Sequence, residues 1–125
     1  MDASRRPLIL VVDDNATIRS LVTTILGSHD MEAVAVTDGD EALAFLELRR
    51  PDLVLLDLSM PRLDGVEVLR QVRAHPALHD LRVVMLTAVA STPRFQDVHA
   101  YKPNGFIEKP FHINDLLDQV RRALA

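Results

Sequence analysis

Apolar residues form five short continuous runs along the chain, each bounded by Pro, Asp, Gly or other polar residues. These runs predict five β-strands, because they are too short for most helices and are flanked by strand-ending residues. They cover residues 7–12, 31–36, 52–56, 81–86 and 105–107. Since the runs are mostly continuous rather than alternating, we expect a sheet that is covered on both faces.

Between these runs, apolar residues recur at the spacing of one helix face. The clearest stripe runs from Ile18 to Leu26, and we expect this helix to end at Gly27. The other four stripes are Ala42, Leu43 and Leu46; Val68, Leu69 and Val72; Phe95, Val98 and Tyr101; and Ile113, Leu116, Leu117, Val120 and Leu124. A strand followed by a helix, five times over, predicts an α/β fold with a doubly wound parallel sheet.

Composition narrows the class of protein. The 125 residues fit a single domain over residues 1–125, with 1–6 as a loose lead-in and no output domain expected within them. A net charge of −4 without a basic stripe argues against nucleic acid as the main partner. The chain has no cysteine, and no apolar run approaches the roughly 18 residues of a membrane span. We therefore expect a cytoplasmic protein without membrane insertion.

Polar side chains follow the predicted strands. Asp13 and Asp14 follow the first strand, Asp57 the third and Thr87 the fourth, and Lys109 comes soon after the fifth. In open α/β sheets, ligands bind beyond the carboxyl ends of the strands, so these side chains should meet at one edge. Three carboxylates repel one another and need a cation, and Mg²⁺ prefers such oxygen ligands. The lysine would hold an anionic group such as a phosphoryl, and the threonine would donate a hydrogen bond to it.

Four segments in this order, each at a predicted strand end, carry a family resemblance. They are "VVDDN", "LLDLSMPRLDG", "MLTA" and "FIEKPF". Each is unspecific alone, but together they make the chain resemble a response-regulator receiver domain of bacterial two-component signalling, in the single-domain form found in chemotaxis. The resemblance covers roughly residues 8–124 and implies the flavodoxin-like strand order 2-1-3-4-5.

The resemblance implies that Asp57 accepts a phosphoryl group from a phosphohistidine of a sensor histidine kinase or a histidine phosphotransfer protein. A free aspartate has a pKa of about 3.9, so it is ionised and nucleophilic at neutral pH. Lys109 would pair with one phosphoryl oxygen and Thr87 would hydrogen-bond another, because phosphoryl transfer needs mainly alignment and charge neutralisation. In this family the bond between Lys109 and Pro110 is usually cis, which would fix the direction of the ammonium.

The resemblance also implies a Mg²⁺ site. Asp14 and Asp57 would bind the ion, Asp13 would act largely through water, and the backbone carbonyl of Ser59 would be a further ligand. The chain would act as a switch with slow self-dephosphorylation and not as an enzyme. Thr87 would move inward and let Phe106 rotate in. This would reshape the surface of the fourth helix, fifth strand and fifth helix, which would control a downstream protein or form a homodimer.

Three positions depart from the family pattern. Phe106 stands where many members have tyrosine, so no hydroxyl is available there. The turn "YKPNG", residues 101–105, replaces a small Gly/Ala-rich turn and would make that surface stiffer and more basic. Val89 lies two residues past Thr87, and we hypothesise that it slows self-hydrolysis because it offers water no hydrogen bond. Equal phosphorylated lifetimes for Val89→Glu and the wild type would refute that.

Structural roles compete with these functional ones. Asp14, Asn15 and Thr17 also suit the start of a helix. We take Asp64 as an N-cap or first-turn acid and Gly65 as a close-packing residue. The five histidines show no metal-ligand spacing and are expected at the surface.

Two other function classes stay open beside the switch. A phosphatase of the haloacid-dehalogenase type would carry a second acid two residues after its nucleophile, where this chain has Ser59. A scaffold of receiver fold, working without phosphorylation, would be expected to lose some of the acidic residues and the lysine.

Overall fold

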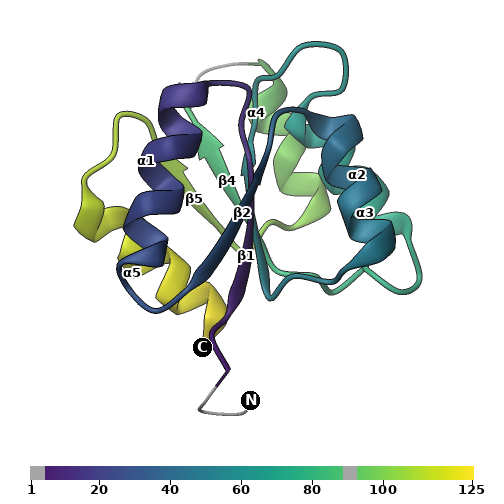
Figure 1. Cartoon of the computed structure of the whole chain (residues 1–125). Coiled ribbons are helices and arrows are strands. Elements are labelled where there is room, and N and C mark those ends of the chain that lie inside the picture. The colour runs from purple at the N-terminus through teal and green to yellow at the C-terminus, as the bar shows by residue number, and fades with distance from the viewer. Residues whose placement is uncertain (1–4, 89–92) are drawn as a thin grey trace.

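The computed structural model describes residues 5–88 and 93–125, and Figure 1 labels its helices and strands. The strands are β1 (Leu8–Val12), β2 (Glu32–Val36), β3 (Leu53–Asp57), β4 (Val83–Thr87) and β5 (Gly105–Glu108). The helices are α1 (Ala16–Gly27), α2 (Gly39–Leu48), α3 (Gly65–Ala74), α4 (Pro93–Val98), the 3₁₀ turn η1 (His99–Tyr101) and α5 (Ile113–Leu124).

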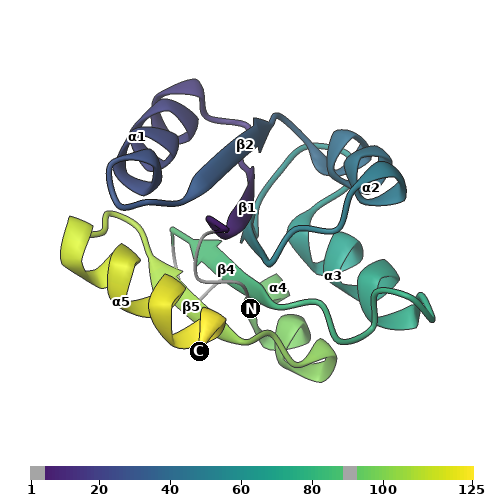
Figure 2. The ribbon, with the colours of Figure 1, turned by 60° about the horizontal axis from the view of Figure 1, so that its bottom comes forward.

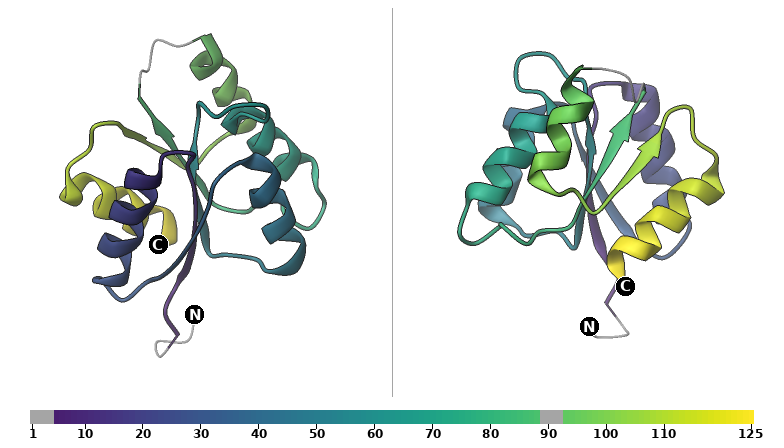
Figure 3. Two further views of the ribbon diagram at one scale, coloured as in Figure 1. Left: turned by 45° about the horizontal axis from the view of Figure 1, so that its top comes forward. Right: turned by 180° about the vertical axis from the view of Figure 1, so that it is seen from behind.

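The five strands form one parallel sheet in the order β2-β1-β3-β4-β5. This confirms the expected α/β fold and its strand order. Helices α1 and α5 cover one face, and α2 and α3 cover the other (Figures 1 and 2). Helix α4 lies on the same face as α2 and α3, where Val98 joins their core, and Figure 3 shows it beside α3.

The core consists of two apolar layers, one on each face of the sheet. Along β1, Leu10 and Val12 pack toward α2 and α3, whereas Ile9 and Val11 pack toward α1 and α5. β3 and β4 alternate in the same way. Each successive side chain of these strands therefore meets a helix layer, which explains why the apolar runs are continuous.

Several strand boundaries differ from those predicted by a residue or two. Leu81 is 2% exposed but precedes β4, so its apolar character reflects burial and not strand pairing. β1 begins at Leu8 because Pro7 has no backbone N–H to donate, although the Pro7 carbonyl accepts a bond from the backbone N–H of Glu32. Asp57 is the last residue of β3, paired in register with Leu86.

Side chains cap three helices at the carboxyl edge of the sheet. Asn15, Asp38 and Asp64 accept hydrogen bonds from backbone N–H groups in the first turns of α1, α2 and α3. The helix-start interpretation thus holds for Asn15, and the N-cap prediction for Asp64 is confirmed. All five histidines are exposed, as expected. Within residues 5–88 and 93–125, no helix has the length and apolarity that crossing a membrane requires.

Candidate functional site

The acids that were predicted from the sequence to form a site lie together at the carboxyl edge of the sheet. Carboxylate oxygens of Asp13, Asp14 and Asp57 all lie within 4.8 Å of one another. The Nζ atom of Lys109 lies 2.7 Å from Asp13 Oδ2 and 3.3 Å from Asp57 Oδ1. Asp13 and Lys109, which are 96 positions apart in the chain, therefore belong to one ion-pair cluster. They meet because the parallel strands that precede them end at the same edge of the sheet.

Asp13 is fully buried and held from several directions. Its Oδ1 accepts a hydrogen bond of 2.9 Å from the backbone N–H of Asn15, and its Oδ2 accepts the bond from Lys109. Its backbone carbonyl accepts a 2.8 Å bond from the Arg19 guanidinium. The contact with Arg19 was missed, because a basic residue one turn into a helix carries no local signal of where it reaches.

Asp57 is 4% exposed and ends β3 beside the start of α3. The backbone N–H of Ser59 donates a long bond of 3.4 Å to Asp57 Oδ1. Burial raises the pKa of Asp57 to about 6, and the charge of Asp13 adds to this, while Lys109 partly offsets it. At neutral pH the carboxylate is therefore still mostly ionised.

Lys109 follows β5 and is positioned by the backbone. Its N–H donates a 2.7 Å bond to the carbonyl oxygen of Thr87, and its peptide bond to Pro110 is cis, as the resemblance implied. Burial alone would lower the pKa of Lys109, but the hydrogen bond to Asp13 and the charge of Asp57 outweigh it and raise the pKa. The ammonium therefore stays charged among the carboxylates.

Thr87 and Phe106 lie on the two neighbouring strands β4 and β5. Thr87 is 3% exposed at the end of β4. Phe106 is half-buried, and its ring packs against Phe95 and His99 with centroids 5.2 and 5.1 Å apart. Ser59 is exposed beside Asp57. Val89, the subject of the self-hydrolysis hypothesis, lies outside the described residues.

The charges of the cluster fit a divalent cation. Of the three clustered carboxylates, the two buried ones, Asp13 and Asp57, share the ammonium of Lys109. Buried carboxylates without enough positive charge are costly, and a hard cation with oxygen ligands would remove that cost. Asp14 is exposed, which leaves its carboxylate open to an ion arriving from solvent.

Known proteins match this chain over nearly its whole length. The family model "Response regulator receiver domain" matches residues 9–121. The DNA-binding response regulator MtrA of Mycobacterium tuberculosis is 38% identical over 127 residues, which are 99% of this chain and 53% of MtrA. The probable transcriptional regulator ycf27 of Cyanophora paradoxa is 35% identical over 93% of this chain and 47% of its own. The chain thus spans about half the length of these curated relatives.

Solved structures agree with the family match. The Vibrio cholerae chemotaxis protein CheY4 superimposes with a TM-score of 0.89 at 32% identity, covering 96% of this chain and all of CheY4. A putative response regulator from Chloroflexus aurantiacus gives a TM-score of 0.90 at 28% identity, covering 96% and 98% of the two chains. Sequence, fold and the site at the carboxyl edge agree: the chain belongs to the response-regulator receiver domains of two-component systems.

Proposed function

We propose that this receiver domain is a phosphorylation-operated switch in which Asp57 accepts a phosphoryl group from a phosphohistidine of a sensor kinase or phosphotransfer protein. The observation that carries the proposal is the ammonium of Lys109 between two buried carboxylates, 2.7 Å from Asp13 and 3.3 Å from Asp57. An ammonium in this place can neutralise a phosphoryl oxygen as soon as that group is attached to Asp57.

The transfer step uses groups that lie at the edge of the sheet. A carboxylate oxygen of Asp57 forms the new O–P bond while the N–P bond of the donor phosphohistidine breaks, and the released imidazole takes up a proton from water. Lys109 pairs with one phosphoryl oxygen, and the hydroxyl of Thr87 donates to another. Asp57 is 4% exposed, and its fixed strand-end position supplies the alignment that phosphoryl transfer needs.

The acidic cluster supplies the metal site in this proposal. Asp14, Asp57 and the backbone carbonyl of Ser59 would hold Mg²⁺, with Asp13 acting through water. When bound, the ion would neutralise the transferring phosphoryl group. The hydrogen bonds of Asp13 to Asn15 and Lys109 support its indirect role, since both of its carboxylate oxygens already have partners.

The output in this proposal is a change of protein surface. The phosphoryl group draws Thr87 inward, Phe106 rotates into the space that it leaves, and the surface of α4, β5 and α5 changes. The contact of Phe106 with Phe95 and His99 supports this, because a rotation of its ring has to alter the packing of α4. A downstream protein or a second copy of the chain would read that surface.

A labelling experiment tests the proposal. The protein is incubated with Mg²⁺ and acetyl phosphate, and its intact mass is followed alongside the release of inorganic phosphate. A switch gains one phosphoryl group per chain and releases phosphate slowly, and Asp57→Asn gains none. Rapid release over many turnovers would indicate a phosphatase instead. Absence of any mass gain, with this donor and with a phosphohistidine protein, would indicate a scaffold.

A further inference from the structure

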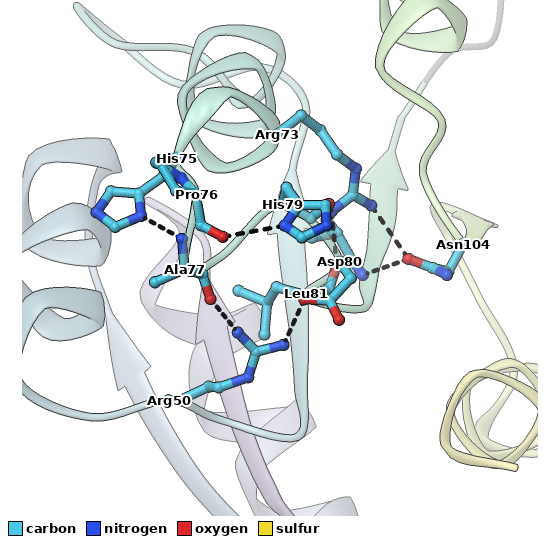
Figure 4. Close-up of polar contacts among 10 residues, drawn as sticks. Arg50, Arg73, His75, Pro76, Ala77, His79, Asp80, Leu81 and Asn104 are labelled. Atoms are coloured by element: carbon cyan, nitrogen blue, oxygen red, sulfur yellow. Dashed lines mark hydrogen bonds and ion pairs between the residues drawn. The ribbon is translucent and has the colours of Figure 1, made fainter.

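Helix α4 is held at its two ends by contacts of different strength. Its C-terminal end continues into η1 and the turn that leads to β5, and Arg73 of α3 holds that turn. Arg73 Nε donates to the carbonyl oxygen of Tyr101 at 3.0 Å, and Nη2 donates to the carbonyl oxygen of Lys102 at 3.1 Å and to Asn104 Oδ1 at 3.2 Å. Figure 4 shows Arg73 reaching Asn104 across this end of the fold.

The same guanidinium also holds the start of β4. Nη1 of Arg73 donates to the carbonyl oxygens of His79 and Leu81 at 3.1 and 2.6 Å. Asn104 is bonded to Val83 in both directions, through its side-chain oxygen at 2.8 Å and its backbone N–H at 2.7 Å. The end of α4 next to β5 is therefore fixed to the sheet by a side chain that uses all of its donor atoms.

At the other end of α4, the attachment found among residues 5–88 and 93–125 is an exposed ion pair. Arg94, in its first turn, forms a forked ion pair with Asp64, with Nε to Oδ2 at 2.9 Å and Nη2 to Oδ1 at 3.2 Å. The two side chains are 49% and 27% exposed, and ion pairs this open to solvent contribute little. If α4 moves, the physical expectation is that this end moves and the Arg73 end stays.

The partner of Arg94 belongs to the loop that builds the site. Asp64 caps α3 by accepting a bond from the backbone N–H of Glu67, and the next residue, Gly65, packs directly on the backbone of Asp57. The ion pair therefore connects the rim of the phosphoryl-accepting site to the first turn of α4. The neighbouring Phe95 is the α4 residue whose ring contacts both Phe106 and His99.

We propose that α4 works as a lever, with its hinge at Arg73 and its latch at the Arg94–Asp64 ion pair. The closed latch places Phe95 against Phe106 and so favours the resting arrangement of that ring. Opening the latch frees the Phe95 end of α4 and favours the arrangement with Phe106 turned inward. The geometry of the lever stands on the contacts alone, whereas its effect on phosphorylation rests on the proposed function.

Two variants open the latch by removing different partners. Arg94→Met removes the guanidinium, and Asp64→Asn removes the charge but keeps a side-chain oxygen that can cap α3. The matched control is Arg70→Met, because Arg70 makes a similarly exposed forked pair with Glu67 that stays within α3. If the two partners act as one latch, the double variant has no larger effect than either single variant.

The first measurement is backbone ¹⁵N relaxation in buffer with chelator, which needs no phosphorylation. We expect lower order parameters at residues 94–97 in both latch variants, and unchanged values at residues 101, 102 and 104 and in Arg70→Met. If the order parameters fall equally at both ends of α4, or do not change at residues 94–97, the lever hypothesis is wrong.

The second measurement is the affinity for beryllofluoride, a mimic of a phosphoryl group, in the presence of Mg²⁺, followed in ¹H–¹⁵N spectra. We expect about two- to five-fold tighter binding in both latch variants and no change in Arg70→Met, the size expected for one exposed ion pair. Unchanged or weaker binding in the latch variants would overturn the latch. If the wild type itself does not bind the mimic, the proposed function is wrong. The relaxation measurement alone then tests whether α4 is hinged at Arg73 and latched at Arg94.

Discussion

Gly65 lies so close to Asp57 that a Cβ atom at position 65 would stand 2.2 Å from the Asp57 carbonyl oxygen. The backbone N–H of Gly65 also donates a 2.9 Å bond to the carbonyl oxygen of Leu58. The start of α3 is thereby packed onto the end of β3, and this contact fixes the residue that we propose as the phosphoacceptor. A side chain of any size at position 65 has to displace backbone.

Replacing this glycine should therefore be costly. We expect Gly65→Ala to lower the free energy of unfolding by about 2 kcal/mol or more and to weaken Mg²⁺ binding, because the backbone of Asp57 must shift. Gly27→Ala is the matched control, since a Cβ there meets nothing within 4 Å. Because Gly27 ends α1, alanine should raise stability by about 0.5–1 kcal/mol. Urea unfolding of both variants checks this, and equal effects of the two would contradict the packing argument.

The raised pKa of Asp57 predicts a pH-dependent cost to folding when no metal is bound. The folded-state pKa of about 6 lies above the ordinary aspartate value of 3.8, so stability falls as the pH rises from about 4 to above 6. In chelator, Asp57→Asn should therefore be more stable than the wild type by about 1–3 kcal/mol at pH 7. The difference should shrink below about pH 4.

Thermal unfolding of both proteins across this pH range, with and without Mg²⁺, measures the effect. Mg²⁺ should stabilise the wild type and close the gap, because the ion compensates the carboxylate that burial penalises. If Asp57→Asn is less stable than the wild type at pH 7 in chelator, burial of the charged Asp57 carboxylate does not lower the stability of the fold, and the prediction is wrong.

Replacing Lys109 should change the affinity for Mg²⁺ and the affinity for a phosphoryl mimic in opposite directions. In Lys109→Met, Asp13 and Asp57 lose their shared ammonium, so Mg²⁺ should bind several-fold tighter while the affinity for beryllofluoride is lost. Isothermal titration with Mg²⁺ measures the first effect, and NMR titration with the phosphoryl mimic measures the second. Weaker Mg²⁺ binding in the variant would mean that Lys109 helps to build the metal site instead of competing with it.

Arg73 should matter for stability far from the site. Its five hydrogen bonds go to acceptors in η1, in the turn before β5 and in the segment before β4, and Arg73→Met would leave several of these acceptors without a donor. We expect a loss of about 2 kcal/mol or more. Arg82→Met is the control, because Arg82 makes a single long bond of 3.3 Å to the carbonyl oxygen of Leu124. Equal denaturation midpoints for the two variants would argue against the anchoring role.

The fold could be predicted from the sequence because its strands are buried on both faces. Ile9, Leu10 and Val11 form one continuous apolar run, and the structure places neighbouring members in opposite core layers. The ends of strands were less predictable, because Leu81 is as apolar as a strand residue but packs outside β4.

The acids and lysine of the site could be placed because each lies at the end of a strand or soon after it. Asp13, Asp57 and Lys109 lie far apart in the chain, yet strand order and direction alone bring them to one edge. The long arginine side chains could not be placed in this way. Arg73 and Arg94 each reach a partner about 30 residues away, and only the packed positions of α3 and α4 decide which carbonyl or carboxylate they meet.

In the proposed function a single carboxylate, that of Asp57, accepts the phosphoryl group. Reduction of the phosphorylated protein with borohydride converts an acyl phosphate to an alcohol, so peptide mapping by mass spectrometry reads out which acid carried it. We predict homoserine at position 57 in the wild type treated with acetyl phosphate and Mg²⁺, and none when chelator is present. Homoserine at position 13 or 14, or undiminished labelling of Asp57→Asn, would contradict the account.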